Sequence, residues 1–526
     1  MKHARRLALA IVTVLCGTVA GQDAELEALR SRLAGDVLRW GGDAEGGAPY
    51  QLRDPADPER VIGFEVELAD LIAERLSRRI GKAVRAEFVQ YEWVSLPLGL
   101  EKGDFDLLIS GYEVSPERRA SVRFSRPYFI FTQQITVRKD EEAIRTLDDC
   151  LLRPVGTLSG SAAAELLEQR SAREVVGYDD NVGPYLDLDL GRIDAVLLDA
   201  PISIYYASTN PRLKLVEPTF APGEYAVGLR PADEVLARAV DQAISELLQT
   251  GDWQKSLRKW RLWNEQQAML ARGGDREAEL AGLGFAPDGT PDAALAAQPA
   301  SLVNIDMVTA AADSWTFSKY APLLVNAAGT TVALTAVSMA VAMAIGLLIC
   351  LLRLYGPWPL RAAALGYVEF FRGVPLLLVL YFLYYGLSSD DFQLPALAAA
   401  VLGFGLNYAA YESEIYRSAI GAVPRGQWEA ARALGMSDTL TFRRIIFPQA
   451  LRTALGPMTN DLVALFKDTS LVSVIAVREL TKEYLILSRS SMKFVELGLL
   501  TAALYLAMSV PLGYLSRWLE ERWGEK

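Results

Sequence analysis

Residues 427–450 read QWEAARALGMSDTLTFRRIIFPQA and lie between two apolar segments. The pattern predicts a short helix that ends at Gly435, a second helix, and a stop at Pro448. Ala430 and Ala431 are small enough for close helix packing, and a glycine readily adopts the positive φ that ends a helix. A polar helix-turn-helix in an apolar region must be explained by the segments around it.

The charge of the chain is unevenly distributed. Most acidic and basic residues of the 526 precede about residue 320, and long apolar runs follow it. A chain of this length can hold two or three domains. The net charge of -11 and the lack of a basic stripe argue against nucleic acid as a partner. We therefore expect a soluble half followed by a membrane half.

The first 20 residues, MKHARRLALAIVTVLCGTVA, have a basic start, an apolar core and a small-residue end, which is typical of a secretory signal peptide. Cys16 would also allow a lipoprotein anchor, although Leu15 before it is large for such a site. The single histidine is His3, so the mature chain would contain none. That excludes a Ser-His-Asp triad, a Cys-His pair and a histidine metal site.

A disulfide and a P-loop are not expected either. Cys150 falls in the exported half and Cys350 in an apolar segment, so a disulfide between them is not expected. No G-x-x-x-x-G-K-[ST] loop occurs in the sequence. We expect neither an enzyme nor a cofactor or metal in this chain, and any ATP would be bound by another subunit.

Residues 24–264 alternate short apolar runs with helical patterns, which predicts α/β structure with parallel sheets. Seven or more strands in this length suit two small lobes better than one sheet. Expected strands are 37–42, 83–89, 105–111, 134–138, 153–158, 173–178 and 193–199. Expected helices are 67–80, 162–170 and 234–251. Residues 265–318 are rich in Ala, Gly and Pro and are expected to form a linker.

Residues 319–520 are expected to form a membrane domain of about five helices. Apolar spans are expected at about 320–352, 362–387, 392–411, 454–477 and 497–515. An exported first half and the distribution of Arg and Lys place residues 421–450 in the cytoplasm. Asp461, Lys467 and Glu414 either contact a substrate or pack between spans, and packing is the favoured role.

Three stretches carry a family resemblance: VEFFRGVPLLLVLYFLYYGL (368–387), LNYAAYESEIYRSAIGAVPRGQWEAARALG (406–435) and LFKDTSLVSVIAVREL (465–480). They resemble the polar amino acid permeases of ATP-binding-cassette (ABC) importers, over about residues 321–520. Loop 421–450 resembles the EAA loop, by which such permeases dock on their ATPase. The resemblance assigns docking to Glu429, Ala430, Ala431, Gly435 and Pro448. An ordinary amphipathic loop is the alternative for this segment.

The exported half has a resemblance of its own. Residues 63–76, 100–129 and 191–201 resemble periplasmic amino-acid-binding proteins, and the match spans about residues 36–260. This implies two α/β lobes that close over a ligand at a hinge. In that family an arginine at position 118 clamps the ligand carboxylate, a bidentate contact that lysine cannot imitate. The alternative is a solvated surface arginine, a role that fits Arg119 better.

Other positions take their roles from the same resemblance. Asp199, at the end of an expected strand, would pair with the ligand ammonium. Amides at Gly160 and Ser161, where a helix begins, would face an anion, although Ser161 could be a simple N-cap. Trp93 and Tyr50 would pack against the ligand or belong to the core. The predicted site is completed by Asp43, Ser110, Gly111 and Glu113.

The sequence departs from the family pattern at two of these positions. Glu113 stands where Ser or Thr is usual, and Ala162 where Thr or Ser is frequent. With Asp43 and Asp199, Glu113 would make the pocket negative. A buried acid needs a partner, so we expect a cationic amino acid as ligand. Alternatively, Glu113 faces solvent or a neighbouring arginine.

These observations predict one subunit of an ATP-driven amino acid importer, a multi-pass protein of the inner membrane with its binding domain in the periplasm. Expected partners are a separate ATPase dimer, a second permease subunit that would form a homodimer, and the amino acid. Tethering would raise the effective concentration of the receptor near the pore. Alternatives are a ligand-gated channel, in which pore segments interrupt the binding domain, or a sensor, which needs an output domain.

Overall fold

The computed structural model describes residues 24–272, 316–387 and 394–523, apart from positions 34, 46, 55, 476 and 492. The expected signal peptide and most of the expected linker lie outside the described residues. The chain divides at about residue 315 into two compact units. We call the first the binding unit and the second the helical unit.

The binding unit contains a sheet of eight strands in the order β4-β1-β5-β10-β6-β9-β7-β8. β1 is parallel to β4 and β5, and β7 is parallel to β8 and β9. The strands are β1 (Val37–Gly42), β4 (Arg85–Gln90), β5 (Leu107–Leu108), β6 (Arg123–Arg138), β7 (Pro154–Leu158), β8 (Glu174–Tyr178), β9 (Ala195–Asp199) and β10 (Leu213–Leu229).

The expectation of purely parallel sheets is wrong. β6 and β10 are long strands, antiparallel to each other and to their neighbours β9 and β5. The sequence analysis missed β10 because Pro218, Pro222 and Gly223 within it are typical of loops rather than of strands. Elsewhere the alternation of strands and helices correctly predicts parallel pairs. The antiparallel β6 and β10 make the sheet a mixed one.

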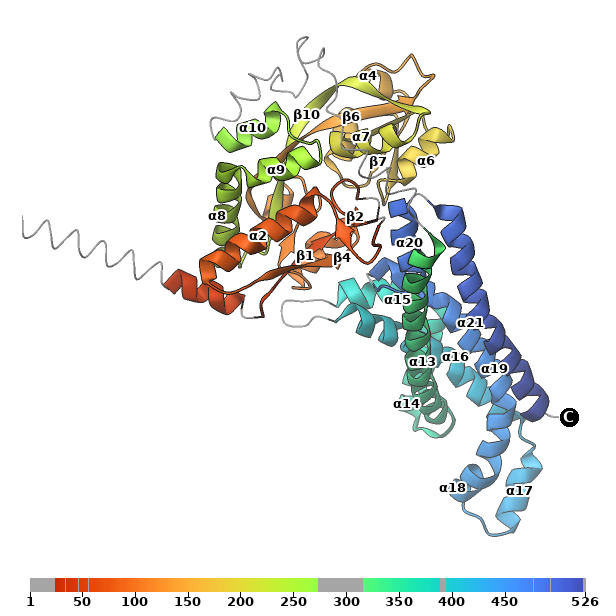
Figure 1. The fold of residues 1–526 in the computed structure, drawn as a ribbon. Helices are drawn as coiled ribbons and strands as arrows, with labels where there is room; N and C mark the ends of the chain where they lie inside the picture. Colours follow the sequence, from red (N-terminus) through yellow and green to blue (C-terminus); the bar gives the residue numbers. More distant parts are fainter. Residues whose placement is uncertain are drawn as a thin grey trace, which may run out of the picture. The chain divides into compact units, whose positions relative to one another are not determined.

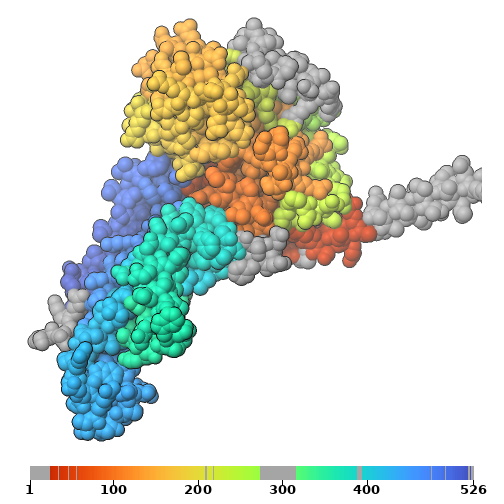
Figure 2. Space-filling view, turned by 180° about the vertical axis from the view of Figure 1, so that it is seen from behind, coloured from red at the N-terminus to blue at the C-terminus, as the bar shows by residue number. Residues whose placement is uncertain are grey.

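β6 and β10 join two lobes. The first lobe holds β4, β1 and β5, and the second holds β9, β7 and β8, with one end of β6 and of β10 in each. The register between β6 and β10 shifts between Val216 and Phe220 and again between Phe220 and Gly223. Two strands with interrupted pairing form a narrow connection, which suits a hinge. The first lobe is orange and the second lobe yellow in Figure 2.

Helices cover the sheet with one apolar face each. α2 (Phe64–Ile80) buries Phe64, Leu68, Ile72 and Leu76, one residue per turn. It ends at Gly81, whose φ of 72° is readily adopted only by glycine. α8 (Glu234–Thr250) likewise ends at Gly251. The core of the second lobe is a separate cluster: Ile135, Val137, Ile144, Cys150, Val155, Ala163, Leu167, Ala195 and Leu197.

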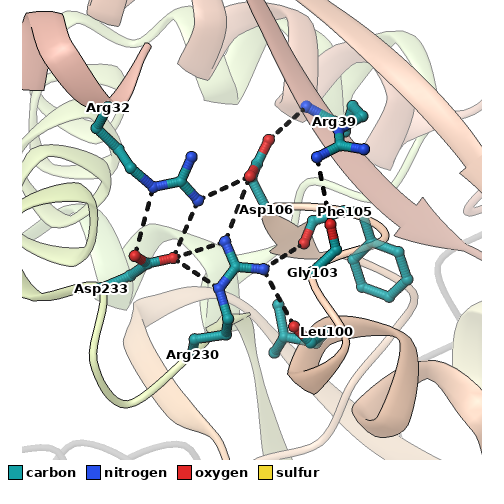
Figure 3. A network of polar contacts seen from close by, with 8 residues as sticks. All are labelled: Arg32, Arg39, Leu100, Gly103, Phe105, Asp106, Arg230 and Asp233. Carbon is teal, nitrogen blue, oxygen red and sulfur yellow. Dashed lines mark hydrogen bonds and ion pairs between the residues drawn. The ribbon is translucent and has the colours of Figure 1, made fainter. Parts of the chain in front are cut away.

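A network of ion pairs closes the first lobe (Figure 3). Arg32 donates to Asp106 at 2.7 Å and to Asp233 at 3.1 Å, although Asp233 lies 201 residues further along the chain. Arg230 contacts the same two carboxylates and donates to the carbonyl of Phe105 at 2.8 Å. The network ties the start of the binding unit to the turn between β10 and α8.

The helical unit consists of helices throughout its described residues (Figure 1). They are α13 (Phe317–Tyr355), α14 (Trp358–Gly373), α15 (Leu376–Tyr381), α16 (Ala396–Ala422), α17 (Arg425–Ala433), α18 (Asp438–Thr441), α19 (Phe447–Asp468), α20 (Leu480–Ser491) and α21 (Phe494–Trp523), with π-helical turns η4 (Phe382–Gly386) and η5 (Phe442–Ile446) and a 3-10 segment η6 (Thr469–Ile475). Its core cluster is formed by Cys350, Tyr416, Ala419, Ile420, Val423, Ile446, Ala450, Ala454 and Met458.

The outer faces of these helices are apolar. Leu499 and Leu506 on α21 are 68% and 60% exposed, as expected for side chains that face lipid. Among the described helices, α13 and the part Phe494–Trp518 of α21 are long and apolar enough to cross a membrane, and the bent pair at 358–386 is a third if it forms one span. The count of five spans stays a prediction, because α16 and α19 carry more charge.

The second expected span is not one straight helix. α14 and α15 meet at a bend of 107°. Val374 is extended, and Pro375 caps α15 with a φ of -57°. A proline lacks the amide hydrogen needed to continue a helix and disfavours helical conformation in the residue before it. The apolar run thus predicts where this apolar segment lies in the sequence, but it does not predict the bend within it.

The expected stop at Pro448 is also wrong. The chain continues without a break from α18 through η5 into α19, and Pro448 lies in the first turn of α19. The π-helical turn just before Pro448 removes the conflict, because its wider hydrogen-bonding pattern accommodates a residue that has no amide hydrogen. Gly435, in contrast, ends the preceding helical segment with a φ of 75°, as expected.

Candidate ligand-binding site

A cavity lies between the two lobes of the binding unit. Its described lining includes residues from β9, from the N-terminus of α5 (Ala162–Gln169), and from the segments before α2 and after β5. Of the predicted site residues, it is lined by Asp43, Tyr50, Trp93, Ser110, Gly111, Glu113, Ser161 and Asp199. Residues that are distant in sequence therefore meet at one place. Among the described residues that line the cavity, none is Lys or Arg.

Arg118 lies directly behind this lining. Its guanidinium carbon is 5.2 Å from the ring centre of Trp93 and 4.6 Å from that of Tyr112, within the range of cation–π contacts. Its side chain is 13% exposed. The alternative of a solvated surface arginine therefore does not hold in this structure.

Glu113 is the ion-pair partner of Arg118. One carboxylate oxygen accepts from Nη1 of Arg118, and the other accepts from the amide of Ala162 at 3.1 Å. The residue is 4% exposed, so it does not face solvent. Solvent or a neighbouring arginine was the alternative to a cationic ligand as the partner of Glu113. The structure shows the neighbouring arginine, Arg118.

Asp199 has neutral donors only among its hydrogen-bond partners. Gln133 donates to it from Nε2 at 2.7 Å, and the hydroxyl of Tyr225 donates to its other oxygen. The residue is 7% exposed and ends strand β9. Burial, and after it the charge of Glu113, raises the pKa of Asp199 well above its usual range. A cation bound here would favour the ionised form.

Asp43 lines the cavity and also holds the loop after β1. Its carboxylate accepts from the amides of Glu45 (2.8 Å) and Trp93 (3.0 Å) and from the side chain of Gln90 (2.9 Å). These donors hold the loop after β1. Asp43 lines the cavity, but its oxygens are occupied by the protein.

Ser110 and Gly111 form the floor beside Trp93. The hydroxyl of Ser110 accepts from Gln51 at 2.6 Å, and its carbonyl accepts from the indole of Trp93 at 3.0 Å. Gly111 has a φ of 57°, and its amide donates to Glu65 at 2.7 Å. Burial raises the pKa of Glu65 to about 8.

Gly160 and Ser161 lie at the start of α5. The carbonyl of Gly160 accepts from Nη2 of Arg118 at 2.6 Å. The hydroxyl of Ser161 caps α5 by accepting from the amide of Ala164 at 3.2 Å, and it donates to the carbonyl of Leu158 at 2.7 Å. Ser161 is therefore an N-cap in this structure, which was the alternative to a ligand contact.

Sequence reasoning missed two neighbours of the site. Tyr225 on β10 donates to Asp199 and shares a hydrogen bond of 2.8 Å with the hydroxyl of Tyr50. Gln133 on β6 is the other partner of Asp199. Both lie on the connecting strands. A signal was available for Gln133, since a buried amide in an apolar strand needs a polar partner.

The loop predicted for docking forms a separate surface at one end of the helical unit, where α17 and α18 lie together (Figure 1). Glu429, Ala430 and Gly435 are exposed, while Ala431 packs inside. Leu434, at the turn, is 80% exposed. Leu440 on α18 is 44% exposed, so this end of the unit presents more than one large apolar side chain.

The helical unit contains a second cavity, of about 400 Å³, at the bend between α14 and α15. Asp461 and Asp468 from α19 and Asn407 from α16 line it. Glu414, in contrast, pairs with Arg353 and, at 2.7 Å, with Arg417. The packing role expected for Glu414 agrees with these contacts, whereas Asp461 borders open space.

Comparisons with known proteins match the two units one after the other. Residues 38–262 match the model of bacterial extracellular solute-binding proteins, family 3, and residues 336–525 match that of the binding-protein-dependent transport system inner membrane component. The "Probable amino-acid ABC transporter permease protein YckA" of Bacillus subtilis (strain 168) is 42% identical over 187 residues, which are 36% of this chain and 83% of that protein.

Two further proteins illustrate the range. The glutamine transport system permease protein GlnP of Escherichia coli (strain K12) is 34% identical over 203 residues, 38% of this chain and 93% of that protein. The solved structure of holo ArgBP from T. maritima has a TM-score of 0.38 and 28% identity, and covers 44% of this chain and 98% of that one.

The helical unit and the matches to it define an importer permease of the inner membrane. The chain belongs to the amino-acid ABC transporter permeases and carries a family 3 solute-binding domain ahead of its permease domain. The two matches are consecutive, so no pore segment interrupts the binding domain. Neither the channel nor the sensor gains support.

Proposed function

We propose that this chain captures a cationic amino acid outside the membrane and passes it through a permease whose motor is a separate ATPase. The choice of a cationic ligand rests on the surroundings of Asp199. It lies buried at the cavity with neutral donors only, and no described residue lining the cavity is basic. An ammonium group would supply the missing opposite charge.

Thermal unfolding of the full chain in detergent, with each common amino acid in turn, tests the ligand. A ligand that binds the folded state raises the midpoint by mass action. We expect a rise with arginine, lysine or ornithine that is reduced in Asp199→Asn. A larger rise with neutral or acidic amino acids would overturn the cationic preference and leave the importer in place.

We propose further that loop 421–450 docks on the ATPase and that two copies of this chain form the permease. The support for docking is the exposed surface of α17 and α18, on which Leu434 and Leu440 are 80% and 44% exposed. Space around Gly435 is open, since a Cβ there would meet no atom within 4 Å. A bulky residue at this position would therefore meet no atom of the chain, although its φ of 75° adds backbone strain that a control must separate.

Gly435→Arg tests the docking. The variant is expected to bind ligand normally and to lose at least about nine-tenths of transport, because tenfold corresponds to only about 1.4 kcal/mol of interface energy. Uptake by proteoliposomes that contain the ATPase is the readout. Gly435→Ala controls for the positive φ, and Gly81→Arg, at a helix end of the binding unit with a φ of 72° and equally open space, controls for an added charge and for the strain of a side chain at positive φ. Full uptake by Gly435→Arg would contradict docking at this turn.

A further inference from the structure

Glu113 and Arg118 together connect the two lobes. Both belong to the first lobe, on the segment between β5 and β6. Their contacts reach the start of α5 in the second lobe: Arg118 donates to the carbonyl of Gly160 at 2.6 Å, and Glu113 accepts from the amide of Ala162 at 3.1 Å. Arg118 also donates to the carbonyl of Glu113 at 2.9 Å. The chain thus supplies its own carboxylate between an arginine and a helix N-terminus.

The carboxylate of Glu113 blocks the access of a ligand carboxylate to Arg118. Glu113 lines the cavity, whereas Arg118 lies behind it. A ligand carboxylate in the cavity would face the like charges of Glu113 and Asp199. It reaches Nη1 of Arg118 and the amide of Ala162 only by taking the place of Glu113, which is bonded to both in this structure.

A displaced Glu113 would in turn lose its cation. The residue is 4% exposed, and a buried carboxylate without a partner is strongly unfavourable. A ligand that brings a second positive charge removes this penalty. The side-chain cation of arginine, lysine or ornithine would serve, because the ligand α-ammonium would already be paired with Asp199.

We infer that Glu113 determines specificity by exchange. The ligand carboxylate replaces Glu113 on Arg118, and the ligand side-chain cation becomes the new partner of Glu113. The inference rests on the proposed function, because it takes a cationic amino acid as ligand. It explains how Glu113, Asp199 and Arg118 together match a molecule with two positive charges and one negative charge.

Three related ligands separate the steps of the exchange. Arginine carries both the carboxylate and the side-chain cation. Citrulline has nearly the same shape without the side-chain charge, and agmatine is arginine without the carboxylate. In the wild-type chain, arginine should bind at least about 30-fold more tightly than citrulline or agmatine. This factor is at the low end of the affinity losses caused by removing one partner of a buried charge pair.

Glu113→Gln removes the charge and keeps the size and the acceptor for the Ala162 amide. The variant should bind citrulline about 30-fold more tightly than the wild type does, so that the preference for arginine nearly disappears. Glu117→Gln is the matched control, since Glu117 is an exposed glutamate on the same segment and should leave both affinities unchanged. Titration of the full chain in detergent, followed by tryptophan fluorescence, gives the dissociation constants. Glu113→Ser repeats the test if the glutamine variant unfolds.

The outcomes are distinct. An unchanged preference for arginine over citrulline in both Glu113 variants would overturn the exchange and leave the proposed function standing. Wild-type binding of agmatine as tight as that of arginine would do the same, because no carboxylate would be needed. A wild-type chain that binds no cationic amino acid would overturn the proposed function and the exchange together.

Discussion

Two of the glutamate–arginine pairs among the described residues differ in their surroundings in an instructive way. In the binding unit, Glu113 has one cation, Arg118, and the pair lies beside a cavity that a second acid, Asp199, also lines. In the helical unit, Glu414 has two cations, Arg353 from α13 and Arg417 from its own helix. An acid with surplus cations holds helices together. An acid with a single cation, beside another acid, is open to a positively charged ligand.

The largest effect is expected from removing the arginine of the first pair. Arg118→Ala leaves Glu113 buried without a cation and removes the proposed partner of the ligand carboxylate. The affinity for arginine should fall by about 100-fold or more, within the range for breaking a buried charge pair. Arg119→Ala is the control, because Arg119 is exposed. If the two variants bound the ligand arginine with affinities that differ by less than a few-fold, the assignment of Arg118 would be contradicted.

The corresponding change in the second pair should affect stability and not binding. Arg353→Ala leaves Glu414 with Arg417, so the loss should be about 1–2 kcal/mol, between the values for exposed and buried pairs. The midpoint of thermal unfolding should fall while the dissociation constant for arginine stays unchanged. A double-mutant cycle with Glu414→Gln isolates the pair. Weaker ligand binding in Arg353→Ala would remove the contrast between the pairs.

The smallest effect is a dependence of ligand affinity on pH. Burial and Glu113 raise the pKa of Asp199, opposed by its hydrogen bonds from Tyr225 and Gln133 and by the charge of Arg118. Without ligand, the carboxyl therefore keeps its proton to a higher pH than a free aspartic acid does. A cation binds the ionised form, so affinity should fall as the pH drops through this raised pKa, by at most tenfold per unit.

Asp199→Asn tests the source of that dependence. The variant cannot ionise, so its weaker binding should vary less with pH than that of the wild type. Titrations with arginine between pH 5 and 8 provide the measurement. A wild-type affinity that rises on acidification would show that another group controls binding.

The sequence predicts the regular parts of the fold because apolar runs of the right length can form little else. β1, β7, β8 and β9 lie where such runs occur. β10 was missed because its prolines and glycine have loop propensity, and only pairing with β6 over most of its length makes it a strand. The bend at Pro375 could have been expected from the proline alone.

The site was harder to predict than the fold. Resemblance pointed to Arg118 and Asp199, and the structure brings both to one cavity region. The partner of Glu113 was left open, since either solvent or an arginine would satisfy a carboxylate. Tyr225 and Gln133 could not be identified as partners of Asp199, because they come from strands 26 and 66 residues away in the chain. As ligand contacts, all the site residues remain predictions.

The network of Arg32, Asp106, Arg230 and Asp233 has a mechanical consequence. It fastens the start of the binding unit to the turn after β10, and α10 (Glu265–Arg272) is fixed to the middle of β6 through Gln267, which bonds both backbone groups of Ile130. The first described helix of the binding unit is thus fixed to the first lobe through Arg32, and α10 is fixed to β6 through Gln267. β6 and β10 carry the chain between the lobes, and Glu113 and Arg118 add contacts to the start of α5. A movement of the second lobe about β6 and β10 need not displace α10, which is bonded to Ile130.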